Sequence, residues 1–283
     1  MNEHIRIRRA ERLSSKGIYE VIRRDGDEEL HRPLKSLVWS GVAAGILIAF
    51  SVVGEAVFRV NLPDTPGRYL IENLGYSFGF LLVILGRMQL FTENTITTVL
   101  PLVKDRTRTC LIAVLRLWSV VLTANVVGAS LAALFIVHGS AFDGAMLEAV
   151  NELSTHATGF PAGEGFVRAI PAGVLVASIV WMMPGQNGNE VLMIVLFTWL
   201  IAAGDFTHVI AGSVEMWVLV FQDMLQPREA VFSFFLPVLA GNVVGGTAVF
   251  AMLAWGQVQA EVEPDPERAQ PRSRNPESPE ALG

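Results

Sequence analysis

Six stretches of the chain are apolar enough and long enough to cross a membrane. A spanning helix needs about 20 mostly apolar residues, with a range of about 17 to 25. The six stretches cover residues 37–60, 71–102, 110–137, 166–183, 190–221 and 231–256. The pattern predicts an all-α, polytopic membrane protein with six transmembrane helices.

Polar and turn-forming residues interrupt the second and fifth stretches near the middle. The second contains GRMQLFTENT at residues 86–95, and the fifth contains AAGDFTH at residues 202–208. Irregular backbone at membrane depth is tolerated only where it is buried in protein or lines a water-filled path. We therefore expect the second and fifth helices to be broken and to line the path of a substrate.

Short matches relate the two halves of the chain in the same order. AGILIA at residues 44–49 matches AGVLVA at 172–177, and Asn-Val-Val-Gly begins at Asn125 and again at Asn242. With three spans per half, the second half enters the membrane from the opposite side, which predicts two inverted three-helix repeats. The two asparagines are expected to bond backbone groups that the broken helices leave free. The simpler interpretation is close helix packing at the glycines alone.

Composition agrees with a membrane protein that has polar ends. Apolar residues make up 52% of the chain and charged residues 17%, whereas soluble domains average about 25% charged residues. We predict a charged, amphipathic N-terminal segment (1–35), a channel domain (36–257) and a disordered C-terminal segment (258–283). The N-terminal segment is compatible with a helix on the inner membrane surface, a solvated helix or a partner contact.

Lysine and arginine set the expected orientation. If both termini lie on one side, that side holds nine Lys or Arg in the N-terminal segment, three in the loop 103–109 and three in the C-terminal segment. The opposite side holds Arg59, Arg68, Arg168 and Arg228. Because Lys and Arg concentrate in cytoplasmic loops, both termini are expected in the cytoplasm.

Several other classes of protein are disfavoured. The net charge of −6 argues against nucleic-acid binding, and the single cysteine, Cys110, excludes an internal disulfide and a Cys-rich metal site. We expect no cofactor and no metal. An intramembrane enzyme is a remote alternative. A serine hydrolase needs a hydroxyl next to a base, whereas Ser213 lies five residues from His208, on a different helix face.

The interrupted stretches resemble those of the formate/nitrite transporter family. The resemblance covers residues 37–256 and rests on Leu90-Phe91-Thr92, on the region of His208 and on the Asn-x-x-Gly pair. ENLGY at 72–76 and LFTENT at 90–95 are similar to a divergent, uncharacterised bacterial inner-membrane branch. The resemblance implies an aquaporin-like protomer in a homopentamer in the cytoplasmic membrane. Its pores would carry small monovalent weak-acid anions such as formate or nitrite, often with a proton.

The resemblance also implies roles for individual residues. His208 would be the central pore histidine, Thr92 would face it, and Phe91 and Leu90 would flank the constriction. Phe80 and Tyr76 would occupy the outer and inner apolar gate positions, in an order that is left open. Ile201 stands where many members carry an aromatic gate residue. The working hypothesis is that His208 and Thr92 attract an anion and ease its protonation, because a neutral acid crosses an apolar constriction more readily.

This chain departs from the family pattern at several positions. Thr207 stands where a glutamate is common, and Gly212 where an asparagine is common. Charged Arg87, Glu93 and Asp205 lie in or beside the breaks; they are expected either to form an ion pair that joins the breaks or to act as a filter for a different anion. A neutral small-solute pore is the alternative function.

Overall fold

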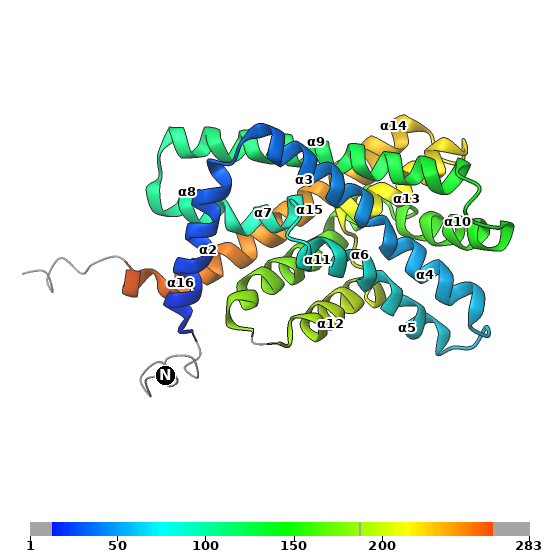
Figure 1. The fold of residues 1–283 in the computed structure, drawn as a ribbon, viewed down its shortest axis with the longest axis horizontal. Coiled ribbons are helices and arrows are strands. Elements are labelled where there is room, and N and C mark those ends of the chain that lie inside the picture. The colour runs from blue at the N-terminus through cyan, green and yellow to red at the C-terminus, as the bar shows by residue number, and fades with distance from the viewer. Residues whose placement is uncertain (1–12, 187, 263–283) are drawn as a thin grey trace, which may run out of the picture.

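Helices account for nearly all of the regular structure in the computed structural model of this protein, which describes residues 13–186 and 188–262 (Figure 1). In the first half, the helices are α2 (Ser15–Leu30), α3 (Leu34–Leu47), α4 (Ala49–Asn61), α5 (Arg68–Glu72), η1 (Asn73–Tyr76), α6 (Ser77–Leu85), α7 (Phe91–Thr97), α8 (Val99–Asp105) and α9 (Arg108–His138). In the second half, they are α10 (Gly144–Thr158), α11 (Ala162–Met182), η2 (Met183–Gly185), α12 (Glu190–Ala203), α13 (Val209–Phe221), α14 (Pro227–Glu229), η3 (Ala230–Phe235), α15 (Leu236–Val243), η4 (Val244–Ala251) and α16 (Met252–Val262).

The prediction of an all-helical protein with several apolar spans is confirmed. Within the described part of the chain, five continuous helical stretches are long and apolar enough to cross a membrane. They are Leu34–Asn61, Arg68–Leu85, Arg108–His138, Ala162–Gly185 and Pro227–Val262. The fifth predicted stretch is divided between α12 and α13, each of which is too short to span a bilayer alone.

Both interrupted stretches break within the segments that the sequence marks. α6 ends at Leu85 and α7 begins at Phe91, while α12 ends at Ala203 and α13 begins at Val209. Glu93 lies inside α7 rather than in the irregular segment. The breaks are therefore shorter than predicted in the first half, and the chain resumes a helical course while still inside the protein.

The same turn ends the helix before each break. Arg87 and Asp205 both adopt left-handed backbone conformations, with φ of 51° and 52°. The amide nitrogens of Met88 and Phe206 then lie 3.0 and 2.9 Å from the carbonyl oxygens five residues earlier. This is the hydrogen-bond pattern of a Schellman motif, which satisfies carbonyl groups at a helix end.

Asn125 of α9 closes the first break. Its side-chain oxygen accepts a hydrogen bond from the amide of Phe91, at 2.8 Å. Its side-chain nitrogen donates to the carbonyl oxygens of Gly41 and Gln89, both at 2.8 Å. The residue is fully buried, so one side chain joins α3, the broken segment and α9.

Asn242 of α15 makes the corresponding bonds at the second break. Its side-chain oxygen accepts from the amide of Val209 at 2.8 Å. Its nitrogen donates to the carbonyl oxygens of Ala169 and Thr207, at 2.8 and 3.0 Å. Each asparagine thus holds the first residue of the helix after the break and two carbonyl groups, one of them from the irregular segment.

Glycine allows these helices to come close enough for the asparagines to reach. A Cβ atom placed on Gly45 would lie 2.9 Å from the carbonyl carbon of Asn125. One placed on Gly173 would lie 3.0 Å from that of Asn242. The backbone oxygens of the same asparagines would lie closer still, closer than real Cβ contacts, so the simpler interpretation, close packing at the glycines, holds together with the hydrogen bonds.

The N-terminal helix α2 packs against the protein itself. Tyr19 and Ile22 are buried, and the ring of Tyr19 lies 5.4 Å from that of Trp255 in α16. In Figure 1, α2, α8 and α16 gather at one end of the molecule, and α5, α10 and α14 at the other. Intramolecular packing was not among the three alternatives left open by the sequence.

The ends of the channel domain differ from the predicted boundaries in one respect. α16 continues to Val262, beyond the boundary expected at residue 257. Its last turns meet α2, where the Nζ atom of Lys16 donates to the carbonyl oxygen of Glu261 at 2.7 Å. Residues 1–12 and 263–283, which include most of the predicted disordered C-terminal segment, lie outside the described residues.

The asparagine bonds predict a stability defect. Replacing Asn242 by alanine leaves one buried amide and two carbonyl groups without partners, and each such group costs about 1–3 kcal/mol. We expect the melting temperature of the detergent-solubilised protein, followed by tryptophan fluorescence, to fall by about 5 °C or more. The matched control is Asn151→Ala, because Asn151 is only partly buried and bonds Gln222. Equal melting temperatures for the two variants would contradict the role of Asn242.

The packing of α2 makes a second prediction. Ile22 is buried, whereas its neighbour Val21 is 36% exposed. Truncation of a buried isoleucine to alanine costs about 2–5 kcal/mol. A loss of this size weakens the packing of α2 against the rest of the protein. Ile22→Ala should therefore make α2 sensitive to limited proteolysis, while Val21→Ala should leave it protected. Protection of α2 in both variants would show that Ile22 does not hold it.

Candidate pore site

Thr92 and His208 meet where the two broken helices approach each other. The hydroxyl oxygen of Thr92 lies 2.8 Å from Nε2 of His208, and both residues are buried. His208 is the N-cap of α13, and its Nδ1 accepts from the amide of Ala211 at 3.3 Å. Because Nδ1 is an acceptor, the neutral ring carries its proton on Nε2 and donates it to Thr92. The threonine hydroxyl then keeps its own hydrogen available for another acceptor.

Apolar rings surround this pair. The ring of Phe80 lies 5.0 Å from that of His208 in an edge-to-face arrangement, and Tyr76 lies 5.2 Å from Phe80. Phe91 packs against Trp118 instead, at 5.6 Å. The remaining two gate candidates, Leu90 and Ile201, are buried in the same core.

A small cavity reaches His208 from the side of α10, and we name it the α10 cavity. Its volume is about 70 Å³, and its walls include Tyr76, His208, Glu55 and Glu215. Tyr76 therefore lies on the α10 side of Phe80, which orders two gate positions that the sequence left open. The cavity admits only a few small molecules, since one water occupies about 30 Å³ of liquid.

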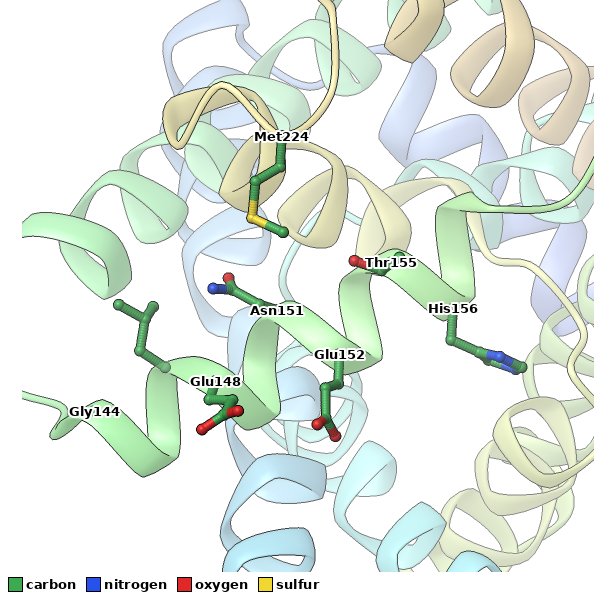
Figure 2. Close-up of a pocket in the computed structure, with 8 residues that line it drawn as sticks. Gly144, Glu148, Asn151, Glu152, Thr155, His156 and Met224 are labelled. Atoms are coloured by element: carbon green, nitrogen blue, oxygen red, sulfur yellow. The ribbon is translucent and has the colours of Figure 1, made fainter.

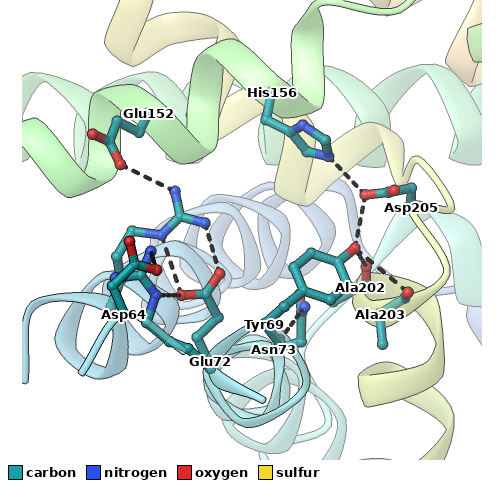
Figure 3. Close-up of polar contacts among 11 residues, drawn as sticks. Asp64, Tyr69, Glu72, Asn73, Glu152, His156, Ala202, Ala203 and Asp205 are labelled. Carbon is teal, nitrogen blue, oxygen red and sulfur yellow. Dashed lines mark hydrogen bonds and ion pairs between the residues drawn. The ribbon is translucent and has the colours of Figure 1, made fainter. Parts of the chain in front are cut away.

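The rim of the α10 cavity carries two groups of polar contacts (Figure 3). In the first, Arg59 donates to Glu72 at 2.6 Å and to Glu152 at 3.4 Å. In the second, Asp205 accepts from Tyr69 at 3.0 Å and lies 2.7 Å from Nε2 of His156. The positive charge of Arg59 is therefore already matched by carboxylates at the rim.

A larger cavity opens on the side of α2, and we name it the α2 cavity. Its volume is about 710 Å³, and acidic residues of α2, among them Asp25 and Glu29, share its wall with Arg87 and Glu93. One carboxyl oxygen of Glu93 is buried and has no hydrogen-bond partner. Burial of the Asp25 carboxyl group, together with the nearby charge of Glu28, raises the pKa of Asp25 above its ordinary value.

The structure does not bring Arg87 and Asp205 together, so the expected ion pair between the breaks is corrected. Arg87 lines the α2 cavity, whereas Asp205 lines the α10 cavity. The physical reason is that both residues occupy the same left-handed position after their helices, and the two helices end toward opposite sides. Glu93 shares a cavity with Arg87 but not with Asp205.

A third hollow lies on the surface and does not reach the site. Figure 2 shows this groove along α10, with Glu148, Asn151 and Glu152 on one helix and Met224 above them. Its volume is about 700 Å³, and neither Thr92 nor His208 lines it. Within residues 13–186 and 188–262, no group of three or more His, Cys, Asp or Glu side chains is placed to hold a metal ion.

Two residues of the α10 cavity had a visible sequence signal that was not used. Glu55 and Glu215 are carboxylates within otherwise apolar stretches, and ionisable residues inside spans commonly face a cavity or a partner. The sequence pattern alone assigns no role to either residue. The rim contacts of Arg59 and His156 had no such signal, because their partners lie far away in the chain.

Comparison with known proteins places the chain in a family. A family described as "Formate/nitrite transporter" matches residues 16–256. The inner membrane protein YfdC of Escherichia coli (strain K12) is 39% identical over 279 residues, which cover 95% of this chain and 90% of that protein. The formate channel FocA of Haemophilus influenzae is 27% identical over 248 residues, which cover 76% and 84%.

Solved structures share the fold. An FNT family ion channel matches with a TM-score of 0.72 at 20% identity, over 86% of this chain and 98% of that chain. A pentameric formate channel with formate bound matches with a TM-score of 0.68 at 19% identity, over 80% and 98%. The family and these neighbours are channels and transporters rather than enzymes. Because the family match spans most of its length, the chain belongs to the formate/nitrite transporter family of membrane proteins.

Proposed function

We propose that this protein is a channel for small monovalent weak-acid anions of the formate or nitrite type, linked to proton transfer through His208. The observation that carries the proposal is the hydrogen bond between Thr92 and Nε2 of His208, at 2.8 Å. This pair lies between two helix breaks and beside the α10 cavity. Membership of a transporter family supports the same class of substrate.

The proposed assembly is a pentamer of six-span protomers in the bacterial inner membrane. The six spans are two inverted repeats, α3–α9 and α11–α16, supported by the matching asparagine bonds and by the shared turn before each break. A pentameric formate channel of the same fold and the inner-membrane relative support the assembly and the location. Cytoplasmic termini follow from the Lys and Arg distribution.

The proposed mechanism uses a change in charge at the apolar constriction. An anion would pay a large desolvation cost beside Phe80, Phe91, Leu90 and Ile201, whereas its conjugate acid would not. The Thr92 hydroxyl keeps a hydrogen to donate to an anion oxygen, because it accepts the Nε2 hydrogen of His208. His208 would thus orient the hydroxyl that holds the anion while it takes up a proton.

A neutral small-solute pore is a second candidate, and one observation favours it. Arg59, the cation in the wall of the α10 cavity, is already bonded to Glu72 and Glu152. An anion therefore finds no free positive charge there. The remote enzyme alternative lacks a hydrogen-bonded pair of nucleophile and base, because the hydroxyl of Ser213 donates to the carbonyl oxygen of Val209 at 2.6 Å and not to His208.

A substrate panel separates the two candidates. We expect the purified protein in liposomes to pass formate, nitrite or hydrosulfide, with flux that rises as the pH on the entry side falls. Acetate and bicarbonate test the upper limit of size, and glycerol tests the neutral-solute alternative. Glycerol flux that is independent of pH, in the absence of anion flux, would replace the proposal with the alternative.

The roles of His208 and Thr92 make a separate prediction. Thr92→Val removes the hydroxyl while keeping the side-chain shape, and should slow anion flux by about tenfold, the equivalent of one hydrogen bond. Thr92→Ser should restore most of the rate. His208→Phe should abolish the pH dependence of the flux.

The matched control is Thr98→Val. Thr98 is also buried in this part of the chain, but its hydroxyl bonds Asn94 and Trp118. If this variant loses as much flux as Thr92→Val, the effect is structural. A His208→Phe variant with the wild-type rate and pH profile would refute the proposed mechanism.

A further inference from the structure

Two carboxyl groups line the α10 cavity without partners. Glu55 of α4 is 4% exposed and Glu215 of α13 is 6% exposed. Both side chains face the same cavity as His208. Within the described residues, neither group takes part in a hydrogen bond or an ion pair. The family resemblance gives no role to either residue.

The nearby cation does not compensate them. Arg59 stands one helical turn after Glu55, yet its guanidinium binds Glu72 and Glu152. Arg68, which shares Glu72 with Arg59, lies 3.0 Å from Asp64 and 3.6 Å from Glu72. The positive charge around the cavity is therefore already paired with other acids.

The remaining titratable groups that face the cavity are also engaged or uncharged. Asp205 is held by His156 and by the hydroxyl of Tyr69. The ring of Tyr76 lies 5.2 Å from that of Phe80, tilted by 43°, and a phenol carries no positive charge. His208 donates to Thr92 through Nε2 and accepts a backbone hydrogen bond through Nδ1. None of these groups offers a positive charge to Glu55 or Glu215.

A pair of bare carboxylates in so small a space is costly, because each ion loses its hydration and repels the other. A positive charge held in the cavity with them would offset this cost. A proton fits best, because a bound proton needs no space for a hydration shell. A proton held there is also next to His208, where the substrate is proposed to become neutral.

We propose that Glu55 and Glu215 form a proton-binding site in the α10 cavity, from which a proton passes to the anion held at Thr92 and His208. The transfer of the proton to the anion rests on the proposed function, whereas the proton-binding site does not depend on it. In the transfer, an O–H bond of one carboxyl group breaks and an O–H bond to the anion forms. The carboxylate left behind regains its proton from hydronium in the solution that the cavity faces.

Infrared spectroscopy of the full-length protein in liposomes, without any substrate, tests the site. The wild type should show the C=O stretch of protonated carboxylic acids near neutral pH, and the double variant E55Q/E215Q should lose part of it. The difference spectrum isolates these groups from Glu93, whose partly buried carboxyl lies in the α2 cavity. The control E148Q changes an exposed carboxylate of the surface groove along α10 and should retain the whole band.

Flux measurements then test the transfer. With formate and an acidic medium on the side of entry, E55Q/E215Q should be slower than wild type by on the order of 100-fold, the lower end of what a positioned proton donor contributes. Its rate should also lose the dependence on pH, while E148Q keeps the wild-type rate and the wild-type pH dependence. Elution of the double variant as the same assembly as wild type shows that the loss is not one of folding.

Several outcomes would overturn the inference. An unchanged carboxylic-acid band in E55Q/E215Q means that the pair holds no proton. Carboxylate bands that shift when ammonium is added to the wild type mean that a small cation occupies the site instead. A wild-type pH profile of flux in the double variant rejects the transfer. Failure of wild type to carry any anion rejects the proposed function, and the infrared result still decides whether the site binds a proton.

Discussion

The whole architecture depends on satisfying backbone groups where helices stop inside the membrane. A broken helix at that depth exposes amides and carbonyls that have no water to bond. One buried asparagine per break, Asn125 or Asn242, supplies two of these bonds. Because each asparagine also reaches a neighbouring helix, the same bonds fix the relative positions of the helices that surround Thr92 and His208. The Thr92–His208 pair is therefore placed by the backbone around it as well as by its own hydrogen bond.

Much of this arrangement could be predicted from the sequence, because its causes are local. Long apolar runs, a cluster of polar residues within a run and an asparagine repeated in the same context are all visible along the chain. The placement of Arg87 was not predictable in this way: its distance from Asp205 depends on the directions in which two separate helices end. The packing of α2 was equally hidden, since apolar residues such as Ile22 gain a partner only when Trp255 is folded beside them.

The two sides of the Thr92–His208 pair are chemically unlike. The α10 cavity is narrow and its charges are mostly paired, whereas the α2 cavity is wide and lined by several acids with Arg87 among them. The apolar rings of Tyr76 and Phe80 stand on the narrow side. The surroundings on the two sides of the pair therefore differ, although the two breaks are built by the same turn and the same kind of bond.

The contact between α2 and α16 has a consequence for the order in which the chain folds. α2 is among the first helices to leave the ribosome, and α16 is among the last. The burial of Tyr19 depends on Trp255, and Lys16 bonds a carbonyl near the end of α16. Contacts between such distant segments form late. α2 also packs on α7 and α8, whose Ile96, Val99 and Leu100 share its apolar cluster, so its docking starts on the first half of the chain and is completed only when α16 folds beside it.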